Sequence, residues 1–310
     1  MQRIEYDRYG GPELMHLATF ERPKPGPDEI LVQIKAASIN PVDWGIRRGK
    51  MKFITGSSFP RVMGKDFSGV ILEVGADVAD WKAGDEVFGC VPWKRAGSFA
   101  PMALVNGAEI VRKPASISFV QAAALPTVGL TAWHGLVQQA KLQPGQRVLV
   151  NGAAGGVGSA VVQVAQSLSA NITARVGARS FERLKAQGAD AILDYRAPLP
   201  PEFNRRFDVV FDTNGSLKSG DIARLLKRGG VAVDITVKGP KLLRSLLLRR
   251  QKLAFGTVDQ PTLNEVARLA ADGKLRLGIG AEVSIMEAIP LLERLEGGET
   301  LDGKAVIVFG

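Results

Sequence analysis

The sequence predicts an α/β protein in which a doubly wound parallel sheet is inserted into a domain built on a partly open β-barrel. Three regions of different pattern lead to this prediction. Short strand-like runs separated by Gly and Pro come first, and strands then alternate with helices, which is typical of β-α-β crossover units. The last region is too short to fold alone. We therefore expect a discontinuous barrel domain, 1–118 and 256–310, and a sheet domain, 119–255.

The barrel domain is expected from short apolar runs separated by turn residues. These runs are 30–36, 68–74 and 86–91, and Pro25-Gly26-Pro27 is one of the turns. The C-terminal region adds two helical patterns and a last apolar run, 305–309. We expect this region to return to the first domain and complete it.

The sheet domain is expected from β-branched runs that alternate with helical segments. Each strand followed by a helix forms a crossover unit, and such units place their strands parallel in one sheet. The predicted strands are 147–151, 172–176, 191–193, 207–211 and 231–235, and the predicted helices are 158–168 and 181–187.

Charge and cysteine content limit the functions to consider. The chain has 310 residues, with 40 basic and 31 acidic side chains and a net charge of +9, so its surface attracts anions. The one cysteine, Cys90, excludes an intramolecular disulfide and a cysteine-rich zinc site, and it fits a reducing, cytoplasmic location. Two histidines are too few for a histidine-rich metal site, and no apolar segment predicts a secretory signal or a membrane span.

A glycine-rich loop follows the first predicted strand of the sheet domain and opens a predicted helix. Glycine lets the backbone turn tightly and approach a pyrophosphate, whose charge is met by the helix N-terminus. In this strand–loop–helix context the pattern indicates a dinucleotide site; the alternative is a turn that serves only helix–strand packing. The expected cofactor-binding residues are Gly152, Ala153, Ala154, Gly155, Gly156, Val157 and Gly158.

The end of the second strand indicates which dinucleotide binds. An acidic residue there would bind the ribose 2′-hydroxyl of NAD, whereas arginine would pair with the 2′-phosphate of NADPH. The segment 174–180 contains Arg175 and Arg179 and no acid, so we expect NADPH, with both arginines as candidates for the 2′-phosphate. Either arginine could instead be an ordinary solvated surface residue.

Several motifs, in the same order and spacing, carry a family resemblance: 37–44, 64–70, 82–87, 124–133, 151–158 and 207–212. With these motifs the chain resembles the zinc-independent quinone oxidoreductase branch of the medium-chain dehydrogenase/reductase superfamily. The segment 91–94 is similar to a subgroup that includes the mitochondrial reticulon-interacting oxidoreductase and plant alkenal/quinone reductases. The resemblance implies a GroES-like catalytic domain, a Rossmann domain with a cleft between them, and a homodimer.

The resemblance also implies that this chain lacks a catalytic metal. Zinc-dependent members place cysteine, histidine and cysteine where this sequence has Asn40, Lys65 and a residue near Thr127. An amide, an ammonium and a hydroxyl do not replace thiolate and imidazole at a zinc ion, so no metal is expected.

The same resemblance points to individual residues. Asn40, Asp43 and Lys65 are the catalytic candidates, and Asn40 is also expected beside the nicotinamide. A turn role for Asn40, a helix-capping role for Asp43 and an ion pair for Lys65 stay open. The resemblance also implies cofactor contacts by Thr131 and Tyr195. Asn214 is expected to contact the adenine or ribose because it follows the fourth strand, at the carboxyl edge of the sheet.

The expected function is NADPH-dependent hydride transfer to a quinone or an α,β-unsaturated carbonyl, both of which accept hydride without a metal. The alternative is an NADPH-binding protein whose main role is to bind nucleic acid or a partner; no RNA-binding motif supports it, and no nucleic acid is expected. The basic, leucine-rich segment 238–252 is either an amphipathic helix that contacts a membrane surface or an ordinary packed helix.

Overall fold

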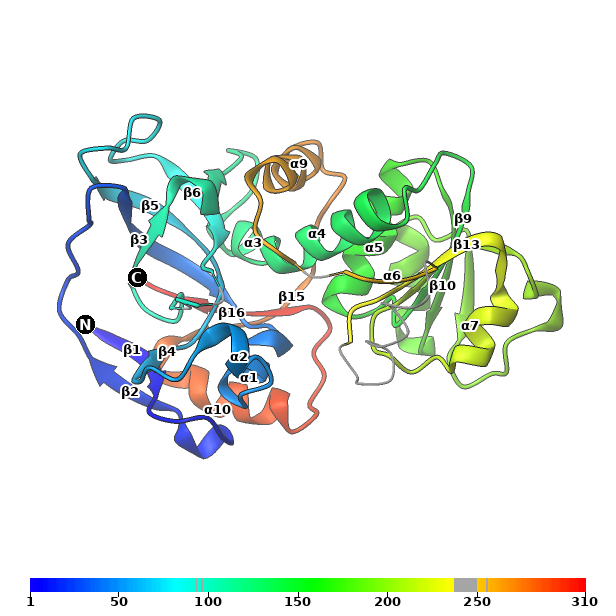
Figure 1. The fold of residues 1–310 in the computed structure, drawn as a ribbon, viewed down its shortest axis with the longest axis horizontal. Coiled ribbons are helices and arrows are strands. Elements are labelled where there is room, and N and C mark those ends of the chain that lie inside the picture. The colour runs from blue at the N-terminus through cyan, green and yellow to red at the C-terminus, as the bar shows by residue number, and fades with distance from the viewer. Residues whose placement is uncertain (93, 96, 237–249, 255) are drawn as a thin grey trace. The chain divides into compact units, whose positions relative to one another are not determined.

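The chain forms two compact units (Figure 1). The computed structural model describes residues 1–92, 94–95, 97–236, 250–254 and 256–310. Unit 1 contains Met1–Thr127, Val258–Ala271 and Arg276–Gly310, and unit 2 contains Val128–Thr257 and Asp272–Leu275. In the sequence, unit 2 has 20 basic and 9 acidic side chains, whereas unit 1 has 20 and 22. The positive net charge of the chain therefore belongs to unit 2.

Unit 1 is built on β-sheets. Its largest sheet has the strand order β15-β16-β3-β5-β6-β8, with β7 paired to β3, and a smaller antiparallel sheet has the order β2-β1-β4. The strands are β1 (Gln2–Tyr6), β2 (His16–Thr19), β3 (Glu29–Ser38), β4 (Arg61–Val62), β5 (Asp66–Val74), β6 (Glu86–Cys90), β7 (Met102–Asn106), β8 (Ile110–Arg112), β15 (Ile279–Ser284) and β16 (Lys304–Val308). The helices are α1 (Pro41–Arg47), α2 (Lys52–Thr55), α3 (Phe119–Ala123), α9 (Gln260–Ala271) and α10 (Ile285–Glu296).

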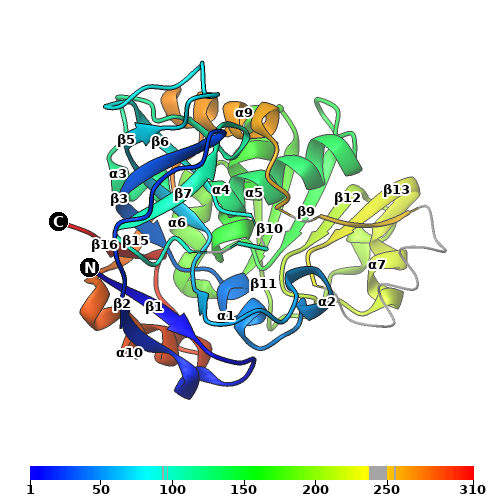
Figure 2. The ribbon, with the colours of Figure 1, turned by 60° about the vertical axis from the view of Figure 1, so that its left-hand side comes forward.

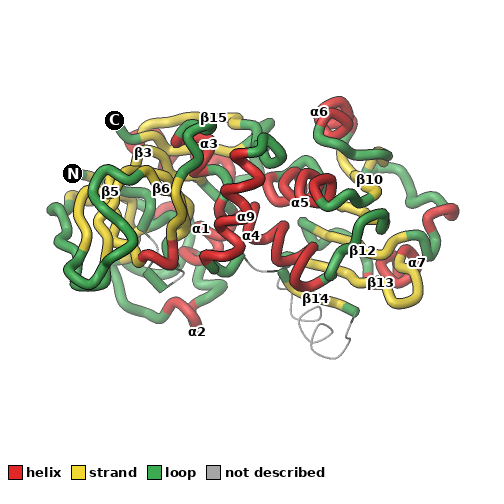
Figure 3. Tube along the Cα trace, turned by 90° about the horizontal axis from the view of Figure 1, so that it is seen from above, coloured by secondary structure: helices red, strands yellow, loops and turns green. Residues whose placement is uncertain are grey.

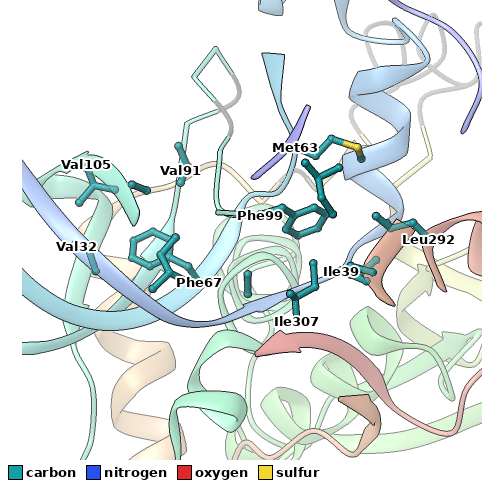
Figure 4. Packing of buried hydrophobic residues seen from close by; sticks show 14 of the residues in the cluster. Val32, Ile39, Met63, Phe67, Val91, Phe99, Val105, Leu292 and Ile307 are labelled. Atoms are coloured by element: carbon teal, nitrogen blue, oxygen red, sulfur yellow. The ribbon is translucent and has the colours of Figure 1, made fainter. Parts of the chain in front are cut away.

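The C-terminal strand β16 joins the large sheet of unit 1. It pairs antiparallel with β3, with Val306 opposite Ser38. Its apolar side chains join one buried cluster in which Phe67, Phe99 and Ile307 are fully buried (Figure 4). This core holds the last strand of the chain against the β3–α1 junction, where Asn40 lies.

Unit 2 is a six-stranded parallel sheet with the strand order β11-β10-β9-β12-β13-β14. This is the 3-2-1-4-5-6 order of doubly wound dinucleotide-binding domains, so the predicted α/β fold class is confirmed. Strands β9, β12 and β13 lie side by side in Figure 2. The strands are β9 (Arg147–Asn151), β10 (Asn171–Val176), β11 (Ala191–Asp194), β12 (Phe207–Asp212), β13 (Leu226–Asp234) and β14 (Gln251–Leu253).

Helices pack on the strands of unit 2, as Figure 3 shows in red and yellow. Helix α5 packs on β9 and β10, α6 on β11, and α7 on β12 and β13. Helix α4 (Pro126–Trp133) begins in unit 1 and belongs to unit 2 from Val128 on. The other helices of unit 2 are α5 (Gly156–Ser167), α6 (Phe181–Ala186) and α7 (Ser219–Leu225), and a π-helical turn spans His134–Gln139.

Residues 238–249 of the basic segment 238–252 lie outside the described residues. For them, neither the membrane-contacting amphipathic helix nor the ordinary packed helix is tested. Lys252 belongs to strand β14 and not to the expected helix, because Gln251–Leu253 pairs with β13. Within the described ranges, no helix is long and apolar enough to span a membrane.

Candidate functional site

The glycine-rich loop of unit 2 connects the carboxyl end of β9 to α5. Gly155 is the N-cap residue of this twelve-residue helix. Gly152 has a φ of +78°, in the left-handed region that favours glycine. A Cβ atom on Gly158 would lie 2.2 Å from the Gly152 carbonyl oxygen and 2.6 Å from the Ala153 Cα atom, so only glycine lets the helix pack this closely on the loop. The N-terminal N–H groups of α5 thus border a compact backbone turn, which fits a pyrophosphate.

A buried amide fixes the loops at this edge of the sheet. Asn151 is 1% exposed, and its Nδ2 atom lies 2.8 Å from Asp212 Oδ1, 3.0 Å from Asn214 Oδ1 and 2.9 Å from Ser216 Oγ. Asp212 also accepts the backbone N–H groups of Gly215 and Leu217. The exposed Asn214 therefore has its Oδ1 engaged, which leaves its amide N–H groups for another partner.

The two candidate arginines differ in their surroundings. Arg175, in β10, is half-buried and donates hydrogen bonds to Asn151 Oδ1, at 3.1 Å, and to the Tyr195 carbonyl, while its Nε is buried and unpaired. Arg179 lies just past β10 and is exposed. Tyr195 is 52% exposed, and its ring lies beside Gly177. Arg175 is therefore held in place by the protein, whereas Arg179 is accessible to a ligand.

Sequence reasoning missed a third arginine beside the loop. Arg183, in α6, donates a hydrogen bond of 3.0 Å to the carbonyl of Ala154. The contact ties α6 to the glycine-rich loop across a separation of 29 residues. No local pattern marks Arg183, because an arginine on a surface helix is ordinary.

In unit 1, buried polar groups meet where β3 ends and β5 begins. Asp66 is fully buried, and its Oδ2 accepts the Asn40 amide at 3.0 Å and the Thr127 backbone N–H at 3.1 Å. Its Oδ1 accepts the Thr127 hydroxyl at 2.6 Å. Asp66 lies within one of the family motifs, 64–70, but was not among the predicted site residues.

Two buried lysines border the same group. Lys65 is 1% exposed and donates a hydrogen bond of 3.0 Å to the Val91 carbonyl. Lys304, from the last strand, is 6% exposed and donates to the Ile39 carbonyl at 2.9 Å and to Asn40 Oδ1. We call Asn40, Asp43, Lys65, Asp66, Thr127 and Lys304 the buried polar cluster.

The carboxyl group of Asp43 has a strongly raised pKa. Burial raises the pKa of Asp43 to about 7. The Asn40 backbone N–H donates a hydrogen bond of 2.7 Å to Asp43 Oδ2, which lowers the pKa but by less than burial raises it. The Asp66 carboxylate raises the pKa further, while Lys304 and Lys65 lower it. Asp43 is 3% exposed, and its Oδ1 is buried without a hydrogen-bond partner. Such a carboxyl group can exchange a proton near physiological pH.

We predict that Asp43 makes unfolding depend on pH. The unfolded chain releases this proton near pH 3.8 and the folded chain near pH 7, so the folded state binds more protons in between. Stability contributed by Asp43 should therefore fall as the pH rises through that window, by up to about 4 kcal/mol. Urea unfolding of the wild type and Asp43→Asn across the window measures this; parallel stability curves would contradict it.

The zinc-ligand positions implied by the resemblance do not fit a zinc ion. The Asn40 amide and the Thr127 hydroxyl are both bound to Asp66, and Lys65 adds an ammonium. Burial raises the pKa of the neighbouring Cys90 thiol to about 12, so this side chain stays protonated at neutral pH and does not supply a thiolate ligand. Among the residues that the structure describes, no group of three His, Cys, Asp or Glu could hold a metal ion.

We also predict that Cys90 is inert in the folded protein. Its thiol is fully buried and packed near Thr127 Oγ1, at 4.0 Å. Modification by iodoacetamide should be at least about 100-fold slower in the native protein than in urea, because the reagent needs an accessible thiolate. Mass spectrometry of both samples measures the rates, and equal rates would contradict the prediction.

Comparison with known proteins identifies the family. The "Alcohol dehydrogenase GroES-like domain" model matches residues 26–115, and the "Zinc-binding dehydrogenase" model matches residues 187–307. The mitochondrial NAD(P)H oxidoreductase RTN4IP1 of Bos taurus is 34% identical over 91% of this chain and 82% of its own length. A chloroplastic quinone-oxidoreductase homolog of Spinacia oleracea is 30% identical, covering 99% of this chain and 98% of its own. The chain belongs to the quinone oxidoreductase branch of the medium-chain dehydrogenase/reductase superfamily.

A solved structure of this branch agrees with that assignment. The Escherichia coli quinone oxidoreductase complexed with NADPH superimposes with a TM-score of 0.83 at 26% identity, over 100% of both chains. The family resemblance predicted from the sequence motifs is thus confirmed, and the protein is an oxidoreductase of an NAD(P)H-dependent quinone and alkenal reductase family.

The predicted site residues lie in two groups, one in each unit. Thr131 is buried within α4, at 4% exposure. The loop residues, both arginines, Tyr195 and Asn214 lie around the carboxyl ends of β9, β10 and β12 in unit 2. Asn40, Asp43 and Lys65 lie together in the buried polar cluster of unit 1.

Proposed function

We propose that this protein is an NADPH-dependent reductase of quinones or α,β-unsaturated carbonyl compounds. One observation carries the proposal: a glycine-rich loop and helix N-terminus at the carboxyl end of β9, with arginines and no carboxylate at the end of β10. This combination suits a dinucleotide with a 2′-phosphate. The family, whose members reduce quinones and alkenals, supports the substrate class.

In this proposal, unit 2 binds and orients the cofactor. NADPH supplies a hydride when it is bound, and the protein supplies the groups that hold it. The backbone of residues 152–158 receives the pyrophosphate, and Arg179 and Arg175 receive the 2′-phosphate. Tyr195, Asn214 and Thr131 are assigned to the remaining cofactor contacts.

We assign the acid–base role to the buried polar cluster of unit 1. A quinone or enone that accepts hydride becomes an oxyanion, which needs a proton. Asp43 is our candidate for holding that proton, because burial raises the pKa of its carboxyl group to about 7. Both amide hydrogens of Asn40 are engaged by Ser38 and Asp66, so we assign Asn40 to orienting the cluster. Lys65 adds positive charge, which favours an anionic product.

Turnover tests the proposal directly. We expect oxidation of NADPH by 1,2-naphthoquinone, by 2-alkenals or by both, with NADH at least about tenfold weaker in affinity because a 2′-hydroxyl makes no ion pair. The ratio of kcat/KM values for the two substrate panels decides between quinone and C=C reduction. Absence of turnover with both panels, together with salt-sensitive RNA binding, would overturn the proposal in favour of the nucleic-acid-binding alternative.

The proposal includes the cytoplasmic location and the homodimer expected from the sequence. The buried, unpaired Cys90 fits a reducing compartment. Light scattering of the purified protein decides the oligomeric state, and a molar mass near that of one chain would reject the dimer.

A further inference from the structure

The last strand of the chain places a buried ammonium beside Asn40. Strand β16 pairs antiparallel with β3, and the Ile39 N–H donates to the Ala305 carbonyl, so residue 304 comes level with residue 40. Lys304 then donates hydrogen bonds to the Ile39 carbonyl and to Asn40 Oδ1. The remaining residues of the strand are apolar, so Lys304 is an exception in its own element.

The charges around Asn40 allow one orientation of its amide. An ammonium only donates hydrogen bonds, so the atom facing Lys304 is the oxygen; a carboxylate only accepts, so the atom facing Asp66 is the nitrogen. The second amide hydrogen is taken by the Ser38 carbonyl, at 3.2 Å. Lys304 and Asp66 therefore hold opposite ends of the same side chain.

The position of Lys304 is costly, which argues against a role in packing alone. Burial lowers the pKa of Lys304, and the Asp66 and Asp43 carboxylates oppose this effect. An apolar side chain of similar volume would fill the same space without the desolvation cost. The ammonium balances the two carboxylates of the cluster.

We propose that Lys304 is a positioning residue of the reduction, which fixes the orientation of the Asn40 amide and balances the charges of Asp66 and Asp43. Its effect on turnover rests on the proposed function, but its effect on the cluster does not. The charged groups that face Asp43 are Asp66, Lys304 and Lys65, so the loss of Lys304 removes one of two cations near that carboxyl group.

The test compares Lys304→Met with Lys304→Arg. In Lys304→Met, kcat for the preferred acceptor should fall at least about tenfold, the scale of losing a hydrogen bond to a charged group, with NADPH affinity within about twofold of wild type. In the protein without cofactor, the midpoint of the Asp43-dependent stability step should move to higher pH, because a cation that favours the carboxylate is gone. Lys304→Arg keeps the charge and should retain the wild-type midpoint and part of the activity.

Lys113→Met is the matched control, and it should leave kcat and the midpoint unchanged. Lys113 is a half-buried lysine of unit 1, and its ammonium is likewise bound, to the carbonyls of Pro114 and Ile117 and to Glu86. Wild-type kcat and an unmoved midpoint in Lys304→Met would overturn the inference. If Lys304→Met does not fold, Lys304→Arg decides: a retained midpoint with partial activity supports the inference, and a shifted midpoint overturns it. If the wild type has no reductase activity, the proposed function fails, while the midpoint without cofactor still tests Lys304.

Discussion

Replacing Gly158 with alanine should weaken NADPH binding by at least about 100-fold, the scale of losing two charge-assisted hydrogen bonds. The new Cβ atom would lie 2.2 Å from the Gly152 carbonyl oxygen and 2.6 Å from the Ala153 Cα atom. Both neighbours are backbone, so they cannot rotate away, and α5 must move off the loop. The N–H groups at the helix N-terminus would then no longer point to a common phosphate position. Quenching of intrinsic fluorescence by NADPH measures the affinity.

Gly220→Ala provides the control for this substitution. Gly220 lies in α7, and a Cβ atom there meets no other atom within 4 Å. Alanine should leave NADPH affinity unchanged and stabilise the protein by about 0.4–1 kcal/mol, because it restricts the unfolded chain. Wild-type NADPH affinity in Gly158→Ala would show that the phosphate loop is not the cofactor site.

Arg179→Ala should separate the two nicotinamide cofactors. Arg179 is exposed just beyond β10, so its removal should weaken NADPH binding by about 10–100-fold, the range for a hydrogen bond to a charged group, and leave NADH binding unchanged. Arg175→Ala should behave differently. Arg175 holds Asn151 and the Tyr195 carbonyl, so its loss should also lower the midpoint of urea unfolding and weaken both cofactors.

Arg206→Ala is the matched control for the arginine variants. Arg206 is also exposed, but it precedes β12 at the amino edge of the sheet, opposite the phosphate loop. Its removal should change neither affinity, because a screened surface charge at that distance contributes little. Equal losses for NADPH and NADH in Arg179→Ala would contradict the 2′-phosphate assignment.

The parallel sheet could be predicted because the residues that form each strand and helix are adjacent in the sequence. Strands β9, β10 and β12 are short runs rich in apolar residues, each with a helical segment after it, and β9, α5 and β10 lie close to their predicted positions. Crossover handedness and strand alternation then restrict the topology. The glycine-rich loop between β9 and α5 was predictable for the same reason, since its glycines lie close together in the sequence.

The buried polar cluster could be predicted only in part. Asn40, Asp43 and Lys65 came from the family resemblance, but Asp66 was left without a role and Lys304 was not considered. Lys304 is separated from Asn40 by 264 residues, and a lysine at the start of a terminal strand is usually solvated. Nothing local indicates that its ammonium is buried.

The amino-acid sequence by itself determined the fold class and the glycine-rich loop between β9 and α5, because these depend on residue types at short spacing. Only the tertiary structure decided which buried charges meet. It brought Lys304 to Asn40, Asn40 to Asp66 and Asp66 to Thr127, and it anchored Arg175 while leaving Arg179 exposed. The physical reason is that pairing of buried charges depends on distance in space, which strand register sets across hundreds of residues.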